Sequence, residues 1–187
     1  SRVLEHALFS ASVPYRVYGG LRFFERQEVK HALAYLRLLT NPEDDGAFLR
    51  VVNFPARGIG ARTLEQLADG AARAGTSLWQ AACTGGGKVA GFAKLIEDIK
   101  QVTADLPLAE AIDHVIEASG LADYYRADKE GADRLENLNE LVNAAALFSE
   151  ESGSLDAPGS DTTPEASVST ETTQPELDRF LAHAALE

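Results

Sequence analysis

Apolar residues recur at three- and four-residue intervals along nearly the whole chain, which is the spacing of α-helices. The clearest case is 26–39, where Val29, Leu33, Leu36 and Leu39 share one stripe and an Asn-Pro pair follows as a stop signal. The same spacing predicts further helices over residues 2–10, 63–74, 77–83, 89–103, 108–119, 134–148 and 177–186.

Shorter segments complete this pattern. Aromatic and β-branched residues alternate over 14–18, which predicts a short strand. Asp44 or Asp45 is suited to cap a helix that ends near Pro55. The run 84–87, with three consecutive glycines, is typical of a flexible connector. We therefore predict an all-α, irregular helical domain with one short N-terminal strand.

Residues 149–174 break the pattern. They are rich in Ser, Thr, Pro, Gly and acids and contain almost no large apolar side chain. Such a segment cannot bury enough surface to offset the entropy of ordering it. We predict a disordered acidic insertion at the surface.

Charge and cysteine content limit the function classes. The net charge is −12, and residues 149–178 hold eight acids and no base, so the rest of the chain carries −4. Any nucleic-acid contact must therefore come from a local patch. Cys83 is the single cysteine, so no internal disulfide forms, and no apolar run approaches the roughly 20 residues that span a bilayer. These features predict a cytoplasmic protein without a membrane partner.

The sequence Arg-Gly-Ile-Gly at 57–60 opens directly onto the helix predicted over 63–74. A glycine turn at a helix N-terminus presents unpaired N–H groups and the positive end of the helix dipole, which suits a phosphate. An ordinary tight turn with the isoleucine buried as a plug explains the same residues. The candidate phosphate-binding residues are Arg57, Gly58, Ile59, Gly60, Arg62 and Thr63.

No catalytic site is predicted. The run 84–88 resembles a nucleotide-binding P-loop but has Ala82 and Val89 where that motif needs a glycine and a hydroxyl. The four histidines are scattered, and none lies at metal-ligand spacing from another ligand. The pair Asp44-Asp45 is better explained by a helix start than by acid–base chemistry.

Several blocks of the sequence are distinctive. The run PYRVYGGLRFFERQEVK at 14–30 is the longest, AYLRLL, NPEDD, RVVN and RGIG follow in order, and RLENLNEL and FLAHAALE come further on. These blocks resemble UvrD/PcrA/Rep-type superfamily 1 DNA helicases. The blocks extend across most of the chain, so the resemblance is specific.

This resemblance implies the helical 2B subdomain at 19–187, which contains the insertion, and a remnant of the second RecA-like motor domain (2A) at 1–18, to which the predicted strand belongs. It also implies that the ATP-binding loop, the Mg²⁺-binding acids and the arginine finger lie outside this chain. We therefore expect no catalytic residue, metal or cofactor here, and ATP with Mg²⁺ in the parent helicase.

The resemblance further implies roles for residues. The Gly-Ile-Gly turn grips the DNA duplex ahead of the fork in a helix-hairpin-helix manner, at a junction between duplex and single strand. Partners are the remaining domains of the same polypeptide and DNA-repair proteins, in a bacterial cytoplasm near the nucleoid. The alternative is a regulatory module that swivels against the motor and binds little DNA. The expected junction with the motor consists of Gly19, Gly20, Phe23, Phe24, Arg26, Glu28 and Lys30, where packing is favoured over DNA contact for Arg26.

Overall fold

The computed structural model describes residues 22–155 and 173–186, and every regular element in these ranges is helical. A short 3-10 helix, η1 (Phe23–Glu25), precedes the α-helices. These are α2 (Gln27–Thr40), α3 (Asp45–Val51), α4 (Ala61–Ala74), α5 (Leu78–Gly85), α6 (Gly87–Thr103), α7 (Leu108–Ala118), α8 (Leu121–Ala127), α9 (Gly131–Leu155) and α10 (Thr173–Leu186). The all-α prediction is confirmed for this part of the chain, whereas the predicted helix at 2–10 and strand at 14–18 lie outside it.

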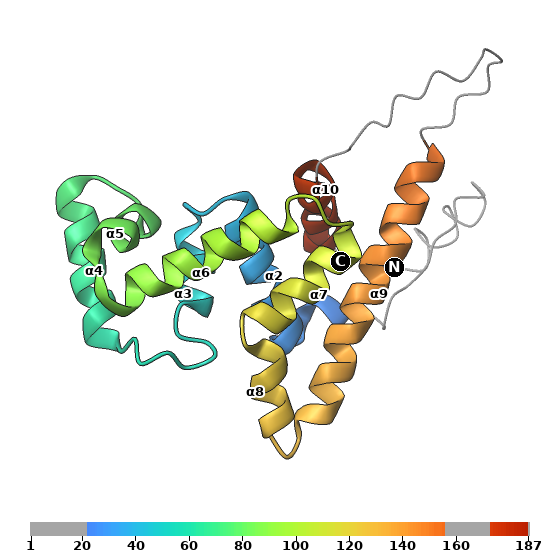
Figure 1. Cartoon of the computed structure of the whole chain (residues 1–187), viewed down its shortest axis with the longest axis horizontal. Coiled ribbons are helices and arrows are strands. Elements are labelled where there is room, and N and C mark those ends of the chain that lie inside the picture. Colours follow the sequence, from blue (N-terminus) through green and yellow to red (C-terminus); the bar gives the residue numbers. More distant parts are fainter. Residues whose placement is uncertain (1–21, 156–172, 187) are drawn as a thin grey trace, which may run out of the picture.

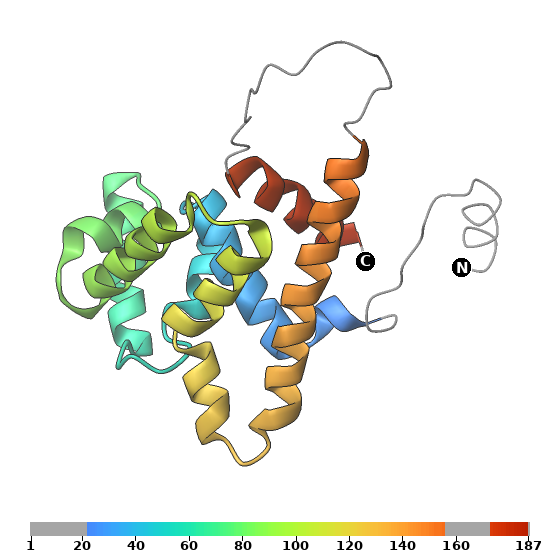
Figure 2. The ribbon, with the colours of Figure 1, turned by 45° about the vertical axis from the view of Figure 1, so that its right-hand side comes forward.

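Helix α2 is the centre of the fold. It packs against α3, α6, α7, α9 and α10, and Figures 1 and 2 show it between the two ends of the molecule. From His31 to Leu39 only Arg37 is exposed. The predicted apolar stripe is therefore only part of the buried surface, because alanines and Tyr35 bury the remaining sides.

Helices α4 and α5 form one end of the molecule, and α8, α9 and α10 lie at the other (Figures 1 and 2). Helix α6 connects the two ends and packs against α2, α5 and α7. Carboxylates fix the helix starts at the first end. Asp44 Oδ1 accepts the Ala47 N–H (3.0 Å), which confirms the predicted cap, and Asp45 Oδ1 accepts the Leu78 N–H (3.1 Å) at the start of α5.

Three predictions of local structure differ from the observed fold. The connector at 84–87 is only one residue long, because α5 continues to Gly85 and α6 begins at Gly87. Helix α8 was not predicted. Helix α9 runs on to Leu155 and α10 begins at Thr173, so both ends of the segment predicted as disordered, 149–174, are helical.

Candidate nucleic-acid interface

The turn between α3 and α4 contains the predicted phosphate-binding sequence, and the side chain of Asn53 organises it. Asn53 Oδ1 accepts the backbone N–H groups of Arg57 (2.8 Å) and Ile59 (3.1 Å). Gly58 lies between these two residues with φ +74°, in the left-handed region that favours glycine. Asn53 and Gly58 thus hold the turn in one conformation. Asn53 was not identified from the sequence as a residue of this site.

Ile59 points into the core, with 1% of its surface exposed. The alternative interpretation of the turn, in which this side chain is buried as a plug, is therefore correct about its burial. Gly58 and Gly60 on either side of it are exposed. A tight turn with a buried isoleucine and a phosphate-binding turn are therefore compatible interpretations. The isoleucine anchors the turn, and the glycines beside it face solvent.

The N-terminus of α4 is open to a ligand. Gly60 is its N-cap residue, and no side chain caps this end. The first intrahelical bond runs from the Leu64 N–H to the Gly60 carbonyl (3.2 Å), so the N–H groups of residues 61–63 have no partner within the helix. These residues are exposed, and the first turn holds no acid. The helix dipole at such an end favours an anion.

Gly60 differs from Gly58 in what the fold requires of it. Its backbone is extended, with φ −84° and ψ 173°, a conformation that any residue adopts. A Cβ built on Gly60 would have no atom of the described residues within 4 Å. Neither the backbone conformation nor the packing within the described residues therefore requires a glycine at this position.

Lys88 adds a positive charge beside the turn. Its Nζ lies 3.5 Å from the carbonyl oxygen of Gly58, 30 residues away in sequence. Lys88 is exposed in the first turn of α6. Arg62 is exposed in the first turn of α4, so two cations flank the open helix end. Sequence reasoning missed Lys88 in this role, because no local signal connects the start of α6 to the turn.

Arg57 does not lie where the sequence prediction placed it. Its Nη1 donates to the carbonyl oxygens of Val51 (3.0 Å) and Pro55 (3.2 Å). Its Nη2 donates to the Tyr35 hydroxyl (2.7 Å) and the Ser119 carbonyl (2.8 Å). The guanidinium faces the protein interior, and both of its terminal nitrogens donate to groups of the fold.

The surroundings of this guanidinium are electrostatically favourable although none of its hydrogen-bond partners is a carboxylate. Val51 is the last residue of α3 and Ser119 is the C-cap of α7, so the cation sits at the negative ends of two helix dipoles. It also lies over the rings of Phe92 (5.1 Å to the centroid) and Tyr35 (5.8 Å). Burial raises the pKa of Tyr35 to about 12, although the neighbouring Arg57 acts in the opposite direction.

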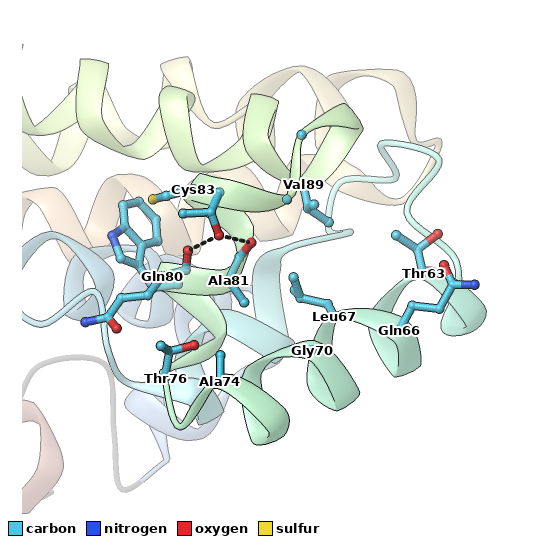
Figure 3. Close-up of a pocket in the computed structure, with 14 residues that line it drawn as sticks. Thr63, Gln66, Leu67, Gly70, Ala74, Thr76, Gln80, Ala81, Cys83 and Val89 are labelled. Atoms are coloured by element: carbon cyan, nitrogen blue, oxygen red, sulfur yellow. Dashed lines mark hydrogen bonds between the residues drawn. The ribbon is translucent and has the colours of Figure 1, made fainter.

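A groove of about 740 Å³ opens between α4 and α5 beside this interface. Thr63 and Gln66 lie at one wall, and Leu67 points across the groove toward Ala81 and Val89 (Figure 3). Cys83 also lines the groove, and its pKa is raised by partial burial and then by Glu97. The thiol therefore stays protonated and is not an activated nucleophile.

The residues predicted to join the motor domain occupy the first turns of the described chain, except Gly19 and Gly20, which lie outside it. Phe23 is buried and meets Phe24 edge to face, with 5.2 Å between ring centroids. Glu28 is buried and its Oε1 accepts from Asn137 Nδ2 (2.6 Å) in α9.

Arg26 and Lys30 differ in their surroundings. Arg26 donates to Asn137 Oδ1 and lies over the Phe23 ring, which agrees with the packing role favoured from sequence. Lys30 is exposed.

No set of side chains in the described ranges is suited to hold a metal ion, since no three His, Cys, Asp or Glu residues cluster there. Asp44 and Asp45 are used as helix-start acceptors, as described above. Among the described helices, none has the length and apolarity that crossing a membrane requires.

Comparison with known proteins identifies relatives along the whole chain. The family model described as the UvrD-like helicase C-terminal domain matches residues 1–187. The chain is 45% identical over 199 aligned positions to DNA helicase II of Escherichia coli (strain K12), and the match covers 100% of this chain and 25% of that protein. It is 34% identical over 163 positions to the ATP-dependent DNA helicase PcrA of Bacillus subtilis (strain 168), covering 81% of this chain and 22% of the relative. The chain thus spans about a quarter of the length of these relatives.

Proposed function

The chain belongs to the UvrD-like helicase C-terminal domain family, and from this premise we propose that it is the 2B subdomain of an ATP-dependent 3′–5′ DNA helicase. In this proposal the turn at 58–60 and the start of α4 hold the phosphate backbone of duplex DNA ahead of the fork. The 149–174 insertion takes no part in DNA contact, because its acids would repel phosphate.

The observation that carries the proposal is the open N-terminus of α4. Its free N–H groups are exposed, uncapped and without a neighbouring acid in the first turn. A Cβ at Gly60 would meet no atom of the described residues within 4 Å, so there is space at this end of the helix. A phosphate oxygen can accept from these N–H groups, because no side chain in the described part of the chain caps them.

The charged contacts come from Arg62 and Lys88. Both are exposed and flank the turn from two different helices. Thr63 contributes a hydroxyl from the same turn of α4. Contacts of this kind read the phosphate backbone and not the bases, which suits an enzyme that must separate strands of any sequence.

The rest of such a helicase supplies the motor. ATP with Mg²⁺ provides the free energy of unwinding there, and this chain holds the duplex that the motor pulls upon. The buried Glu28 near the start of the described chain supports a junction with the motor domain at 19–30, because its hydrogen bond with Asn137 fixes this segment against α9. We place the protein in the bacterial cytoplasm, acting in DNA repair.

The test is a titration of a labelled duplex with a single-stranded tail over a series of salt concentrations. Arg62→Ala removes one proposed phosphate contact and should lower the slope of log K against log[salt] by about 0.9. Arg73→Ala is the matched control, because Arg73 is an exposed arginine at the other end of α4, where it donates to its own helix at the Asp69 carbonyl.

Unchanged binding by Arg62→Ala together with unchanged binding by Lys88→Ala would overturn the assignment of the site. If the wild-type chain binds no duplex at any salt concentration, the regulatory module that swivels against the motor becomes the better description.

A further inference from the structure

We infer that Arg57 is a positioning residue for DNA binding: it fixes the phosphate-binding turn from inside the protein and does not touch DNA. This inference rests on the proposed function, in which the turn at 58–60 binds phosphate. It reverses the role that the residue type and its place next to the glycines predict.

Both terminal nitrogens of the guanidinium already donate within the protein. Four acceptors within 3.2 Å surround the guanidinium: three carbonyl oxygens and the hydroxyl of Tyr35. The guanidinium also lies over the rings of Phe92 and Tyr35, at 5.1 and 5.8 Å from their centroids. To reach DNA, the side chain would have to abandon the carbonyl oxygens of Pro55 and of Ser119 at the end of α7. Leaving such carbonyl groups without a donor costs free energy.

The same contacts tie the turn to the core at its first residue. The Arg57 side chain reaches Tyr35 in the central helix α2 and Ser119 at the end of α7, which are 22 and 62 residues away. Its backbone N–H is held separately by Asn53. Arg57 is therefore held by both its side chain and its backbone immediately before Gly58, so the turn at 58–60 starts from a defined position.

Lysine cannot replace this arrangement. The guanidinium offers five donors in a rigid plane, whereas an ammonium group is a point charge with three donors on a flexible stem. Arg57→Lys keeps the charge next to the turn but loses the bridge between Tyr35, Val51 and Ser119. A charge-based phosphate contact would survive this substitution, and a positioning role would not.

Affinity and salt slope, measured together, separate the two roles in Arg57→Lys: a charge-based contact keeps both, whereas a positioning role loses affinity at an unchanged slope. Each phosphate contact that is lost lowers the salt slope by about 0.9, because fewer counterions are released. A turn that is poorly positioned binds more weakly at every salt concentration with the slope little changed, since Arg62 and Lys88 still provide the charges. Arg57→Lys should therefore weaken duplex binding by about tenfold with an unchanged slope.

The experiment combines that titration with amide hydrogen exchange on the free chain. The Ile59 N–H, held by Asn53, reports on the turn, and the amides of α9 report on the global fold. We expect Arg57→Lys to speed exchange at Ile59 by about tenfold or more while α9 is unchanged. Wild-type exchange and wild-type affinity in Arg57→Lys would overturn the inference, and so would weaker duplex binding with Ile59 still protected.

A second variant covers the case in which Arg57→Lys does not fold. Tyr35→Phe removes one acceptor from the guanidinium at a fully buried site, which DNA cannot reach. Tyr35→Phe should also speed exchange at Ile59 and weaken duplex binding, both by less than Arg57→Lys does. Wild-type exchange together with wild-type affinity in this variant would count against the positioning role. If the wild-type chain binds no duplex, the proposed function fails, but exchange at Ile59 still decides whether Arg57 fixes the turn.

Discussion

The ammonium group of Lys88 lies 3.5 Å from the carbonyl oxygen of Gly58, so the start of α6 is brought against the turn that precedes α4. A cation thus lies beside the turn that leads into the open helix end, although it belongs to a distant part of the sequence. The arrangement depends on the packing of α5 against both α4 and α6.

Lys88→Ala should weaken duplex binding and lower the salt slope by about 0.9, because one phosphate contact is lost. The free energy of unfolding should change by less than about 0.5 kcal/mol, since Lys88 is an exposed side chain. Lys94→Ala is the matched control, an exposed lysine on the same helix that pairs with Asp98 at 3.1 Å. An equal loss of affinity in both variants would show that only the overall charge matters.

Gly60→Asp should separate stability from binding. A carboxylate at this N-cap position can accept an N–H of the first turn of α4 and also interacts well with the helix dipole, so stability should hold or rise by about 0.5 kcal/mol. The same carboxylate occupies and repels the proposed phosphate position, and affinity for duplex should fall by about tenfold or more. Urea unfolding and DNA titration measure the two effects, and Gly60→Asn is the uncharged control.

Gly58→Ala should lower the free energy of unfolding, which urea unfolding measures, whereas Gly60→Asp should not. At φ +74° a Cβ is strained, and it would also approach Lys88 Nζ to 2.5 Å. Stability should fall by about 1 kcal/mol. Equal stability of Gly58→Ala and Gly60→Ala would contradict the different backbone requirements of the two glycines.

Ile59→Ala should destabilise the whole domain, because a fully buried side chain leaves a cavity when it is truncated. The expected loss is about 2–4 kcal/mol, whereas Ile59→Val should lose about 1 kcal/mol. The measurement is the midpoint of urea unfolding at constant m-value. A loss below 0.5 kcal/mol for the alanine variant, within the usual range for surface sites, would show that Ile59 does not anchor the turn.

Much of this fold can be predicted from sequence because most of its helices carry long apolar periods with clear stop signals. Helix α8 escapes prediction because it has seven residues, and its buried Leu121, Ala122 and Tyr125 do not extend over two turns. The all-round burial of α2 also escapes, because alanine is compatible with either a buried or an exposed face.

The candidate site is only partly predictable. The Gly-Ile-Gly sequence locates it, but the roles of its cations depend on tertiary packing. Arg57 looks like a phosphate ligand until the carbonyl of Ser119, 62 residues away, is seen to accept its donor. In the sequence, Lys88 belongs to a run that resembles an incomplete P-loop. Only the structure shows that its position in α6 brings it beside Gly58. Neither contact leaves a periodic signal in the sequence.

The last prediction concerns the pH dependence of stability, which Tyr35 should dominate at alkaline pH. Burial raises the pKa of Tyr35 to about 12 in the folded chain, from 10.0 for an ordinary tyrosine. Between these values the unfolded chain has released the phenol proton and the folded chain retains it. The unfolded state then binds fewer protons, so stability falls as pH rises from about 10 through 12.

The loss should reach about 2–3 kcal/mol, from about 1.4 kcal/mol for each unit of pKa difference. Tyr35→Phe has no such proton to lose, so the difference in unfolding free energy between wild type and this variant should shrink steadily from pH 9 to pH 12. Urea unfolding at several pH values in this range measures that difference, and the other four tyrosines cancel because both proteins contain them. Parallel stability curves for the two proteins would mean that the Tyr35 hydroxyl, and with it the acceptor for Arg57, is open to solvent.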